Sequence, residues 1–67
     1  MSILSERISE LRKEFNLTTR ELGKSIGVSN STIVRWENAE ISPKAEYIIL
    51  LAKFFKVSSD YLLGLEN

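Results

Sequence analysis

The sequence contains no cysteine and no histidine. Disulfide bonds and thiol chemistry are therefore excluded, as are the usual zinc sites, which need sulfur or imidazole ligands. The chain also lacks a glycine-rich phosphate loop, and its carboxylates are scattered rather than paired in apolar surroundings. These absences predict a protein that is not an enzyme and that holds no metal and no small-molecule cofactor.

Long apolar runs are also missing. No stretch approaches the roughly 20 residues that a membrane span requires, and no signal-peptide pattern opens the chain. With 67 residues the chain suffices for one domain, residues 1–67, with a small core. We expect a soluble, cytoplasmic, single-domain protein without a membrane partner.

The chain has no net charge, because 9 Lys and Arg residues balance 9 Asp and Glu residues. Domains that bind nucleic acid are usually basic, so this balance counts mildly against DNA binding. The charges are unevenly distributed, however. Acidic residues lie four apart at Glu6, Glu10 and Glu14, whereas cations gather in or beside residues 18–38: Arg20, Lys24, Arg35 and Lys44. A neutral chain of this kind can present one positive face, with weak non-specific affinity for DNA.

Residues 18–38 carry the most informative pattern. Polar and small residues separate five apolar positions: Leu22, Ile26, Val28, Ile33 and Trp36. Gly27 lies where the chain must reverse between two short helices, and it can take positive φ at little cost. Gly23 leaves room for a second helix to cross close by. This pattern is typical of a helix-turn-helix, whose second helix enters the major groove of double-stranded DNA.

Apolar spacing and capping residues predict an all-α fold of five helices. The predicted helices cover residues 2–15, 18–26, 29–38, 42–55 and 58–63. Thr18 and Glu21 form a capping-box pattern, and Ser42 followed by Pro43 indicates the start of the fourth helix. Ser2 or Ser5 caps the first helix, and Asn16 ends it.

Several motifs stand in a familiar register: Leu17-Thr18, Glu21-Leu22, Gly27-Val28-Ser29, Glu37-Asn38 and Asp60-Tyr61-Leu62-Leu63-Gly64. Over about residues 7–64 the chain resembles the Cro/CI-type (XRE-like) helix-turn-helix family. The resemblance implies a five-helix, lambda-repressor-like domain that binds operator DNA, usually as a homodimer. We expect a sequence-specific transcriptional regulator, a repressor, that reads a short inverted repeat.

Two departures from the family pattern carry structural expectations. Many members have glutamine where this chain has Thr19, and that glutamine braces the phosphate backbone and the recognition helix. The shorter threonine predicts a phosphate contact through its hydroxyl or backbone N–H, without bracing. Ala39 replaces a usual glycine, and alanine at positive φ costs about 1 kcal/mol, so the third helix is expected to end differently.

With Ile33 and Trp36 turned inward, the third helix presents five side chains outward: Ser29, Asn30, Ser31, Val34 and Arg35. The first residues of a recognition helix reach base edges. Asn30 can pair with adenine and Arg35 with guanine, each bidentately, while Val34 can pack on a thymine methyl group. Ser31 can donate or accept, and the resemblance implies base contacts at Asn30, Ser31 and Arg35.

Phosphate contacts are expected first at Thr19 and Arg20, where the backbone N–H groups of a helix start favour an anion. Four further candidates are Ser29, Thr32, Asn38 and Lys44. Ordinary surface or capping roles are the competing interpretation for each, and capping is the stronger one for Ser29.

The resemblance also implies a structural ion pair between Arg12 and Glu37, which match family positions that tie the first helix to the recognition helix. The alternative is two unrelated surface charges.

Tyr47, Leu50 and Phe54 fall on a narrow apolar stripe beside the core stripe of the fourth helix. With Tyr61, Leu62 or Leu65, this stripe predicts a two-fold homodimer interface, which would set two recognition helices about 34 Å apart. The alternative, equally weighted, is that the stripe widens the core.

A protein-interaction module, antitoxin-like or an adaptor with weak or lost DNA binding, is the alternative function that the neutral charge and Thr19 keep open. The sequence leaves open the operator, the sign of regulation, any inducer and whether the chain belongs to a longer regulator.

Overall fold

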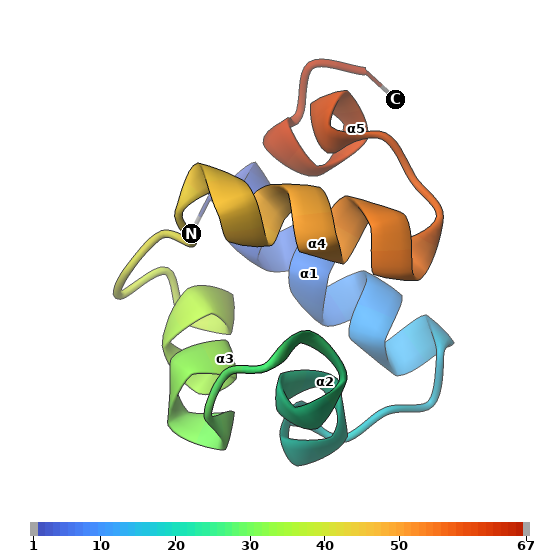
Figure 1. Cartoon of the computed structure of the whole chain (residues 1–67). Helices are drawn as coiled ribbons and strands as arrows, with labels where there is room; N and C mark the ends of the chain where they lie inside the picture. Colours follow the sequence, from blue (N-terminus) through green and yellow to red (C-terminus); the bar gives the residue numbers. More distant parts are fainter. Residues whose placement is uncertain (1, 67) are drawn as a thin grey trace.

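The computed structural model describes residues 2–66, which form five helices and no strand (Figure 1). The helices are α1 (Ile3–Glu14), α2 (Thr19–Ile26), α3 (Asn30–Glu37), α4 (Ala45–Phe55) and α5 (Ser59–Leu63). In Figure 1, α4 crosses in front of α1 at the centre, α5 lies at one end, and α2 and α3 lie together at the other. The predicted all-α, five-helix architecture is confirmed.

Side-chain hydroxyls begin most of the helices, as their sequence signatures predict. Ser2, rather than Ser5, caps α1 and accepts a hydrogen bond from the backbone N–H of Ser5 at 3.0 Å. At α2, the Thr18 backbone N–H donates to Glu21 Oε1 at 2.8 Å, and the Glu21 N–H donates to Thr18 Oγ1 at 3.0 Å. The bond from the Thr18 backbone and that from its side chain lower the pKa of Glu21. Ser29 and Ser58 cap α3 and α5.

The predicted start of α4 is wrong by two residues. Ser42 is not the cap: Lys44 holds that position with extended backbone, and its carbonyl oxygen accepts from the N–H groups of Tyr47 and Ile48. Pro43 is buried rather than placed in the first helical turn. The backbone of Lys44 is still extended, with ψ 160°, so the first helical residue is Ala45 and the Ser-Pro pair does not decide where this helix begins.

Three non-glycine residues, Asn16, Ala39 and Lys56, end helices at positive φ. Ala39 has φ 59°, the Ala39 N–H donates to the Trp36 carbonyl at 3.2 Å, and the Glu40 N–H donates to the Arg35 carbonyl at 2.9 Å. The expectation of a different ending for α3 is therefore wrong. Alanine takes the left-handed conformation that glycine usually supplies, and the strain remains in the fold.

Replacing Ala39 by glycine is expected to raise the free energy of unfolding by roughly 0.5–1 kcal/mol, because relief of the left-handed strain outweighs the added entropy of the unfolded chain. Urea denaturation followed by circular dichroism measures the change. Ala45→Gly is the matched control: Ala45 is helical, so the same substitution is expected to destabilise the protein there. If Ala39→Gly lowered the free energy of unfolding, the inference that Ala39 is strained would be wrong.

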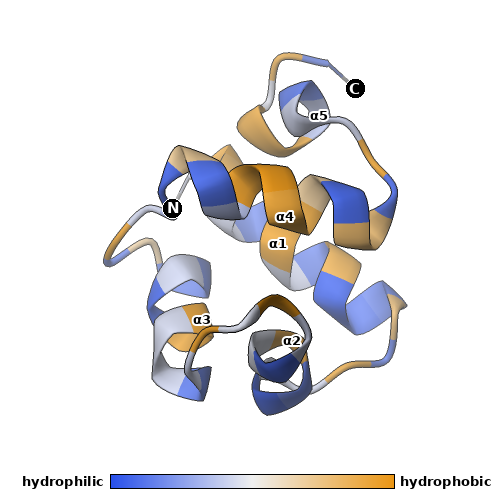
Figure 2. Cartoon of the chain, viewed as in Figure 1, coloured by the Kyte–Doolittle hydropathy of each residue, from blue (hydrophilic) through white to orange (hydrophobic). Residues whose placement is uncertain are grey.

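The core lies where α1, α4 and the helix pair α2–α3 meet, and Figure 2 shows the strongest apolar colouring along α4 and the central turns of α1. It contains nine buried side chains: Ile8, Leu11, Leu22, Ile33, Trp36, Leu51, Ala52, Phe55 and Leu62. Each helix contributes at least one of them, so burial of apolar surface fixes all five relative to one another. Ile33 and Trp36 thereby fix the rotation of α3 about its axis.

Two members of the predicted dimer stripe pack within the chain instead. Tyr47 is half-buried with its ring 5.6 Å from that of Trp36, and Phe54 is half-buried with its ring 6.2 Å from that of Phe15. Leu62, named with the tail, is fully buried in the core. Tyr61 is half-buried beneath the guanidinium of Arg7, 4.0 Å from its ring centroid. Tyr47, Phe54 and Leu62 therefore pack against or within the core, as the alternative interpretation predicts, and the dimer interface itself stays a prediction.

Helix length and hydropathy bear on membrane insertion as well. Between Ser2 and Glu66, none of the helices is both long enough and apolar enough to span a bilayer.

Candidate nucleic-acid interface

The turn between α2 and α3 is held by a close backbone approach at Gly23. The N–H groups of Gly27 and Val28 both donate to the Gly23 carbonyl, at 2.8 and 2.9 Å, and Gly27 takes φ 83°. A Cβ atom at Gly23 would lie only 2.6 Å from the Val28 carbonyl oxygen. The sequence indicated a tight packing site here, but the neighbour is the backbone of the turn, not a crossing helix. This contact fixes the position of α3 against α2.

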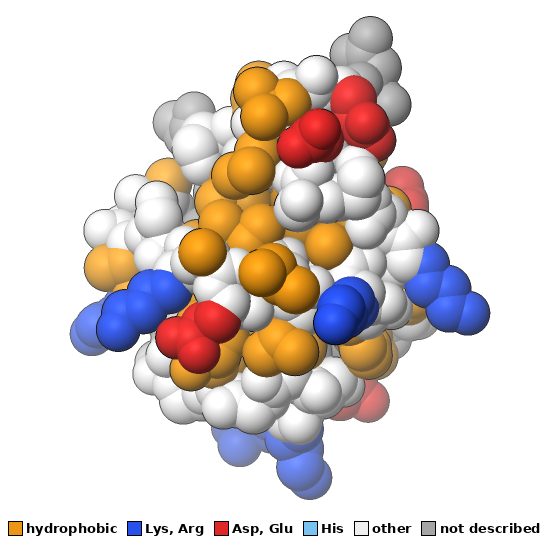
Figure 3. All heavy atoms as spheres, turned by 45° about the horizontal axis from the view of Figure 1, so that its top comes forward, with side chains coloured by type: hydrophobic (Ala, Val, Ile, Leu, Met, Phe, Trp, Pro, Cys, Tyr) orange, Lys and Arg blue, Asp and Glu red, His pale blue; other side chains and the backbone are white. Residues whose placement is uncertain are grey.

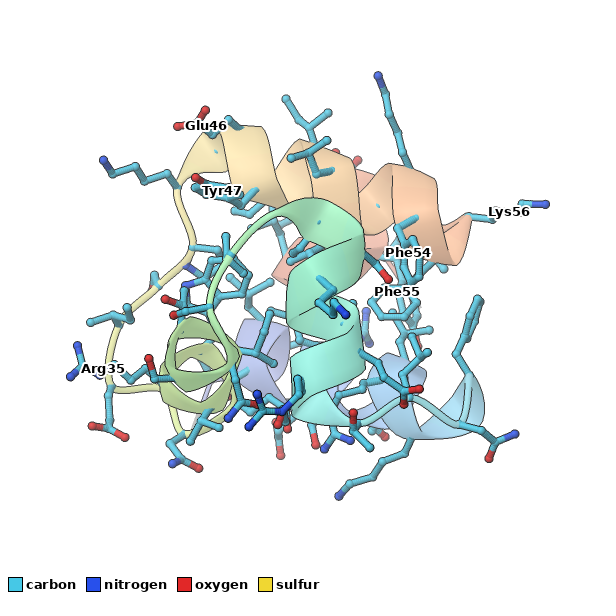
Figure 4. The ribbon with its side chains drawn as sticks, turned by 60° about the horizontal axis from the view of Figure 1, so that its bottom comes forward. Arg35, Glu46, Tyr47, Phe54, Phe55 and Lys56 are labelled. Carbon is cyan, nitrogen blue, oxygen red and sulfur yellow. The ribbon has the colours of Figure 1, made fainter. Side chains whose placement is uncertain are left out.

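The outward face of α3 follows from its buried side. Ile33 is 0% and Trp36 3% exposed, whereas Ser31, Val34 and Arg35 are exposed and Asn30 is half-buried. In Figure 4 the Arg35 side chain extends from α3 away from the other helices. The four residues predicted to contact bases thus share one accessible side of this helix. A guanidinium there can offer two parallel donors to the edge of a guanine.

Hydroxyl groups cluster at the start of α3. Ser29 Oγ accepts from the Thr32 N–H at 3.2 Å and lies 2.8 Å from Thr32 Oγ1 and 3.1 Å from Ser31 Oγ. Ser29 therefore acts as the N-cap of α3, the competing interpretation that the sequence favoured. Thr32 is half-buried and bonded to this cap, so its hydroxyl is partly committed within the protein.

Thr19 does reach the recognition helix, contrary to the sequence-based expectation. Its hydroxyl donates to the amide oxygen of Asn30, which joins the first residue of α2 to the first residue of α3. The shorter side chain suffices because the sharp turn brings the two helix starts together. No pattern in the sequence signals this bond, since the two residues are 11 positions apart and meet only through the angle between the helices.

The helix pair α2–α3 and its connecting turn are called the corner below. The remaining predicted phosphate ligands are exposed residues of α2 and of the ends of the neighbouring elements. Arg20 is exposed in the first turn of α2, and Lys44 is exposed at the start of α4. Asn38 caps the end of α3, where its amide nitrogen lies 3.4 Å from Glu40 Oε2. These residues come from three elements, and each is exposed.

Arg12 and Glu37 form the one ion pair found within residues 2–66. Arg12 Nε donates to Glu37 Oε2 at 2.6 Å and Nη2 donates to Oε1 at 3.0 Å, while Nη1 donates to the Leu17 carbonyl at 2.8 Å. The side chains are only 14% and 11% exposed. The hydrogen bonds to Glu37 raise the pKa of Arg12 despite its partial burial. This bidentate pair links α1, the α1–α2 loop and the last residue of α3.

Metal binding finds no support in the described part of the chain. Residues 2–66 contain no group of three or more carboxylate, imidazole or thiol side chains placed to share an ion.

Comparison with known proteins agrees with this geometry. The sequence profile of the helix-turn-helix family matches residues 8–62. Repressor protein C2 of Salmonella phage P22 is 41% identical over 61 residues, which are 91% of this chain and 28% of the phage protein. The cryptic phage CTXphi transcriptional repressor RstR of Vibrio cholerae is 38% identical over 55 residues, 82% of this chain and 50% of that protein. The chain thus spans half or less of both relatives.

A solved structure of the P22 c2 repressor, in complex with synthetic operator 9T in the presence of Tl⁺, has the same fold. It matches with a TM-score of 0.89 and 38% identity, and the match covers 98% of this chain and 100% of that one. Sequence and structure therefore agree, and this chain belongs to the Cro/CI-type (XRE-like) helix-turn-helix family.

Proposed function

We propose that this chain is the DNA-binding domain of a cytoplasmic transcriptional regulator, a repressor, which reads operator DNA through the major groove with α3. The observation that carries the proposal is the fixed rotation of α3, with Ile33 and Trp36 in the core and Arg35 outside. The likeness to a repressor solved with its operator supports the same orientation.

Roles follow from position on the corner. Arg35 and Asn30 read bases by hydrogen bonds, and Val34, 38% exposed, packs on a thymine methyl group. The side chains of Arg20 and Lys44 attract phosphates through their positive charge. The free backbone N–H groups at the start of α2 donate hydrogen bonds to phosphate oxygens. Because few cations are available to contact phosphates, affinity for random DNA is weak and its dependence on salt concentration is shallow.

In-vitro selection of bound sequences from a random pool, followed by salt-dependent affinity measurements, tests this proposal. Arg35→Ala is expected to cost about 1–3 kcal/mol on the selected site and to relax one position of each half-site. Arg20→Ala is expected to weaken binding to all DNA sequences alike. It is also expected to reduce the slope of log affinity against log salt concentration by about 1. Lys53→Ala removes an exposed cation on α4 and is the control. It is expected to leave operator affinity and the salt slope unchanged. Absence of binding at low salt would favour a protein-interaction module instead.

The second part of the proposal is a homodimer that reads an inverted repeat. Apolar side chains form a band over the face that α4 and α5 present (Figure 3). Four side chains of this region are strongly exposed: Ile49 50%, Leu50 42%, Leu63 43% and Leu65 72%. Of the predicted interface, Leu50 and Leu65 are exposed, whereas Tyr47, Phe54 and Tyr61 are half-buried and pack against the core. Burial of the band against a second copy would remove it from water.

Leu50→Lys is expected to convert a dimer to a monomer, because it places a charge among the apolar side chains that the dimer would bury. Analytical ultracentrifugation of the free protein measures the change. Ile41→Lys is the control, since Ile41 is 44% exposed in the α3–α4 loop and lies outside the band. A Leu50→Lys protein as dimeric as the wild type would reject this interface.

A further inference from the structure

The last helix and the residues after it are held to α1 by the side chain of Arg7. Arg7 lies on α1 and is half-buried, with its guanidinium carbon 4.0 Å from the centroid of the Tyr61 ring. Its Nη1 donates to the carbonyl oxygen of Glu66 at 2.8 Å and also to the carbonyl oxygen of Tyr61. One cation of α1 thus contacts an aromatic ring of α5, the last turn of α5 and the chain beyond it.

The partners of this cation are not carboxylates. Within residues 2–66 the one ion pair is that of Arg12 and Glu37, so Arg7 forms none. Its guanidinium instead contacts a π-face and two carbonyl oxygens, all from residues 61–66. An aromatic face attracts a cation, and the carbonyl groups at the end of a helix carry partial negative charge. The electrostatic contacts of Arg7 are therefore specific to the C-terminal segment.

That segment, residues 59–66, depends on support from the rest of the chain. α5 has five residues, far fewer than an isolated helix needs in water. Leu62 is fully buried in the core, and a Cβ atom at Gly64 would lie 2.9 Å from Cγ2 of Ile3 on α1. Leu65 and Glu66 are exposed, so burial does not hold them in place. Polar contacts must position the end of the segment, and Arg7 supplies them from α1.

We propose that Arg7 is a positioning residue for self-association, which holds residues 59–66 on α1 and thereby places Leu63 and Leu65 against a second copy. Leu63 is 43% and Leu65 72% exposed, and both belong to the apolar band of the proposed interface. This inference rests on the proposed homodimer. It assigns part of the association affinity to a side chain of α1 that does not itself touch the second copy.

Arg7→Met keeps the apolar stem and removes the guanidinium, and Lys13→Met is the matched control, since Lys13 is an exposed cation of the same helix. In analytical ultracentrifugation Arg7→Met is expected to raise the dissociation constant of the dimer about four- to ten-fold. This range corresponds to a segment docked in about a half to a third of the chains, a fraction that enters squared because both copies need it. Lys13→Met is expected to change nothing, and Arg7→Lys, which keeps a cation near the ring, to recover part of the loss.

A double-mutant cycle with Leu65→Ser separates positioning from direct contact. If Arg7 acts by placing Leu65, then Arg7→Met is expected to weaken association less in the Leu65→Ser background than in the wild type. Equal losses in the two backgrounds would mean that Arg7 acts independently of the segment, which would overturn the inference.

Hydrogen exchange checks the docking of the segment without a dimer. In the Leu50→Lys background, Arg7→Met is expected to speed exchange of the Leu65 backbone N–H, bonded to the Asp60 carbonyl at 2.8 Å, about ten-fold. Exchange at Leu51, in the core, is expected to stay unchanged. Equal acceleration at both amides would make Arg7 a general stabiliser of the fold, and no acceleration at Leu65 would mean that Arg7 does not hold the segment. Either result would overturn the inference.

Failure of the proposed homodimer looks different from failure of the inference. A wild type that stays monomeric at every concentration in the ultracentrifuge would remove the homodimer, and the inference would fall with it. A dimeric wild type with an unchanged dissociation constant for Arg7→Met would overturn the inference alone.

Discussion

Replacement of Glu37 by alanine is expected to lower the free energy of unfolding by about 3–5 kcal/mol, because it leaves the Arg12 guanidinium largely buried without its counter-ion. Arg12 is 14% exposed and donates two hydrogen bonds to the Glu37 carboxylate. A domain of 67 residues has a total stability of only roughly 3–10 kcal/mol, so this loss removes a large part of the total. Urea denaturation followed by circular dichroism measures the loss.

The control for this prediction is Glu14→Ala. Glu14 is the last residue of α1, as Glu37 is of α3, but it is exposed. Its removal is expected to change stability by no more than about 0.5 kcal/mol. Because both substitutions delete one carboxylate at a helix end, the difference between them isolates the stranded guanidinium.

A double variant, Arg12→Met with Glu37→Leu, separates the two possible origins of the loss. If the cost comes from an uncompensated charge, an apolar pair of similar volume recovers most of the stability. If both the single and the double variants were as stable as the wild type, Arg12 and Glu37 would be ordinary surface charges, the alternative that the sequence left open. The low exposure of both side chains, 14% and 11%, and their two mutual hydrogen bonds argue against that outcome.

Local rules account for most of what the sequence predicted. The caps at Thr18, Ser29 and Ser58 were predictable because a hydroxyl and the N–H three residues later meet whenever a helix begins there. The stops at Gly27 and Gly64 were predictable because both residues take positive φ without strain. Ile33 and Trp36 followed from helical periodicity. Each of these features depends on residues within one turn of each other.

The features that the sequence did not predict depend on tertiary contacts. Pro43 is buried outside the helix, and α4 begins at Ala45. Ala39 adopts a left-handed conformation because the chain must reverse after α3, although alanine does not favour it. Periodicity placed Tyr47 on a stripe but could not show that Trp36 lies against it. The bond from Thr19 to Asn30 likewise required the angle between two helices.

Replacement of Gly23 by alanine is expected to destabilise the protein by about 1–3 kcal/mol, because the added methyl group meets backbone. The Cβ atom would lie 2.6 Å from the Val28 carbonyl oxygen and 3.3 Å from the Ser29 carbonyl carbon. A flexible side chain could move aside, but these atoms belong to the turn whose N–H groups are bonded to the Gly23 carbonyl. The clash is relieved only if α3 moves away from α2.

The sign of this effect is informative, since two forces oppose each other. At an uncrowded position in a helix, glycine-to-alanine stabilises by about 0.5–1 kcal/mol, because alanine loses less backbone entropy on folding. Lys24→Ala, at the next and exposed position of α2, is the control and is expected to be neutral or slightly stabilising. Urea denaturation of both variants decides whether crowding or helix propensity prevails at Gly23.

The functional consequence follows from the same displacement. The outward residues of α3 and the start of α2 act together only if the corner keeps its angle, so a shifted α3 would separate Asn30 from Thr19. Operator affinity of folded Gly23→Ala protein, measured well below its melting temperature, is therefore expected to fall while the helix content stays close to that of the wild type. A variant more stable than the wild type, with full operator affinity, would mean that the turn relaxes freely and that the close approach at Gly23 does not fix the recognition helix.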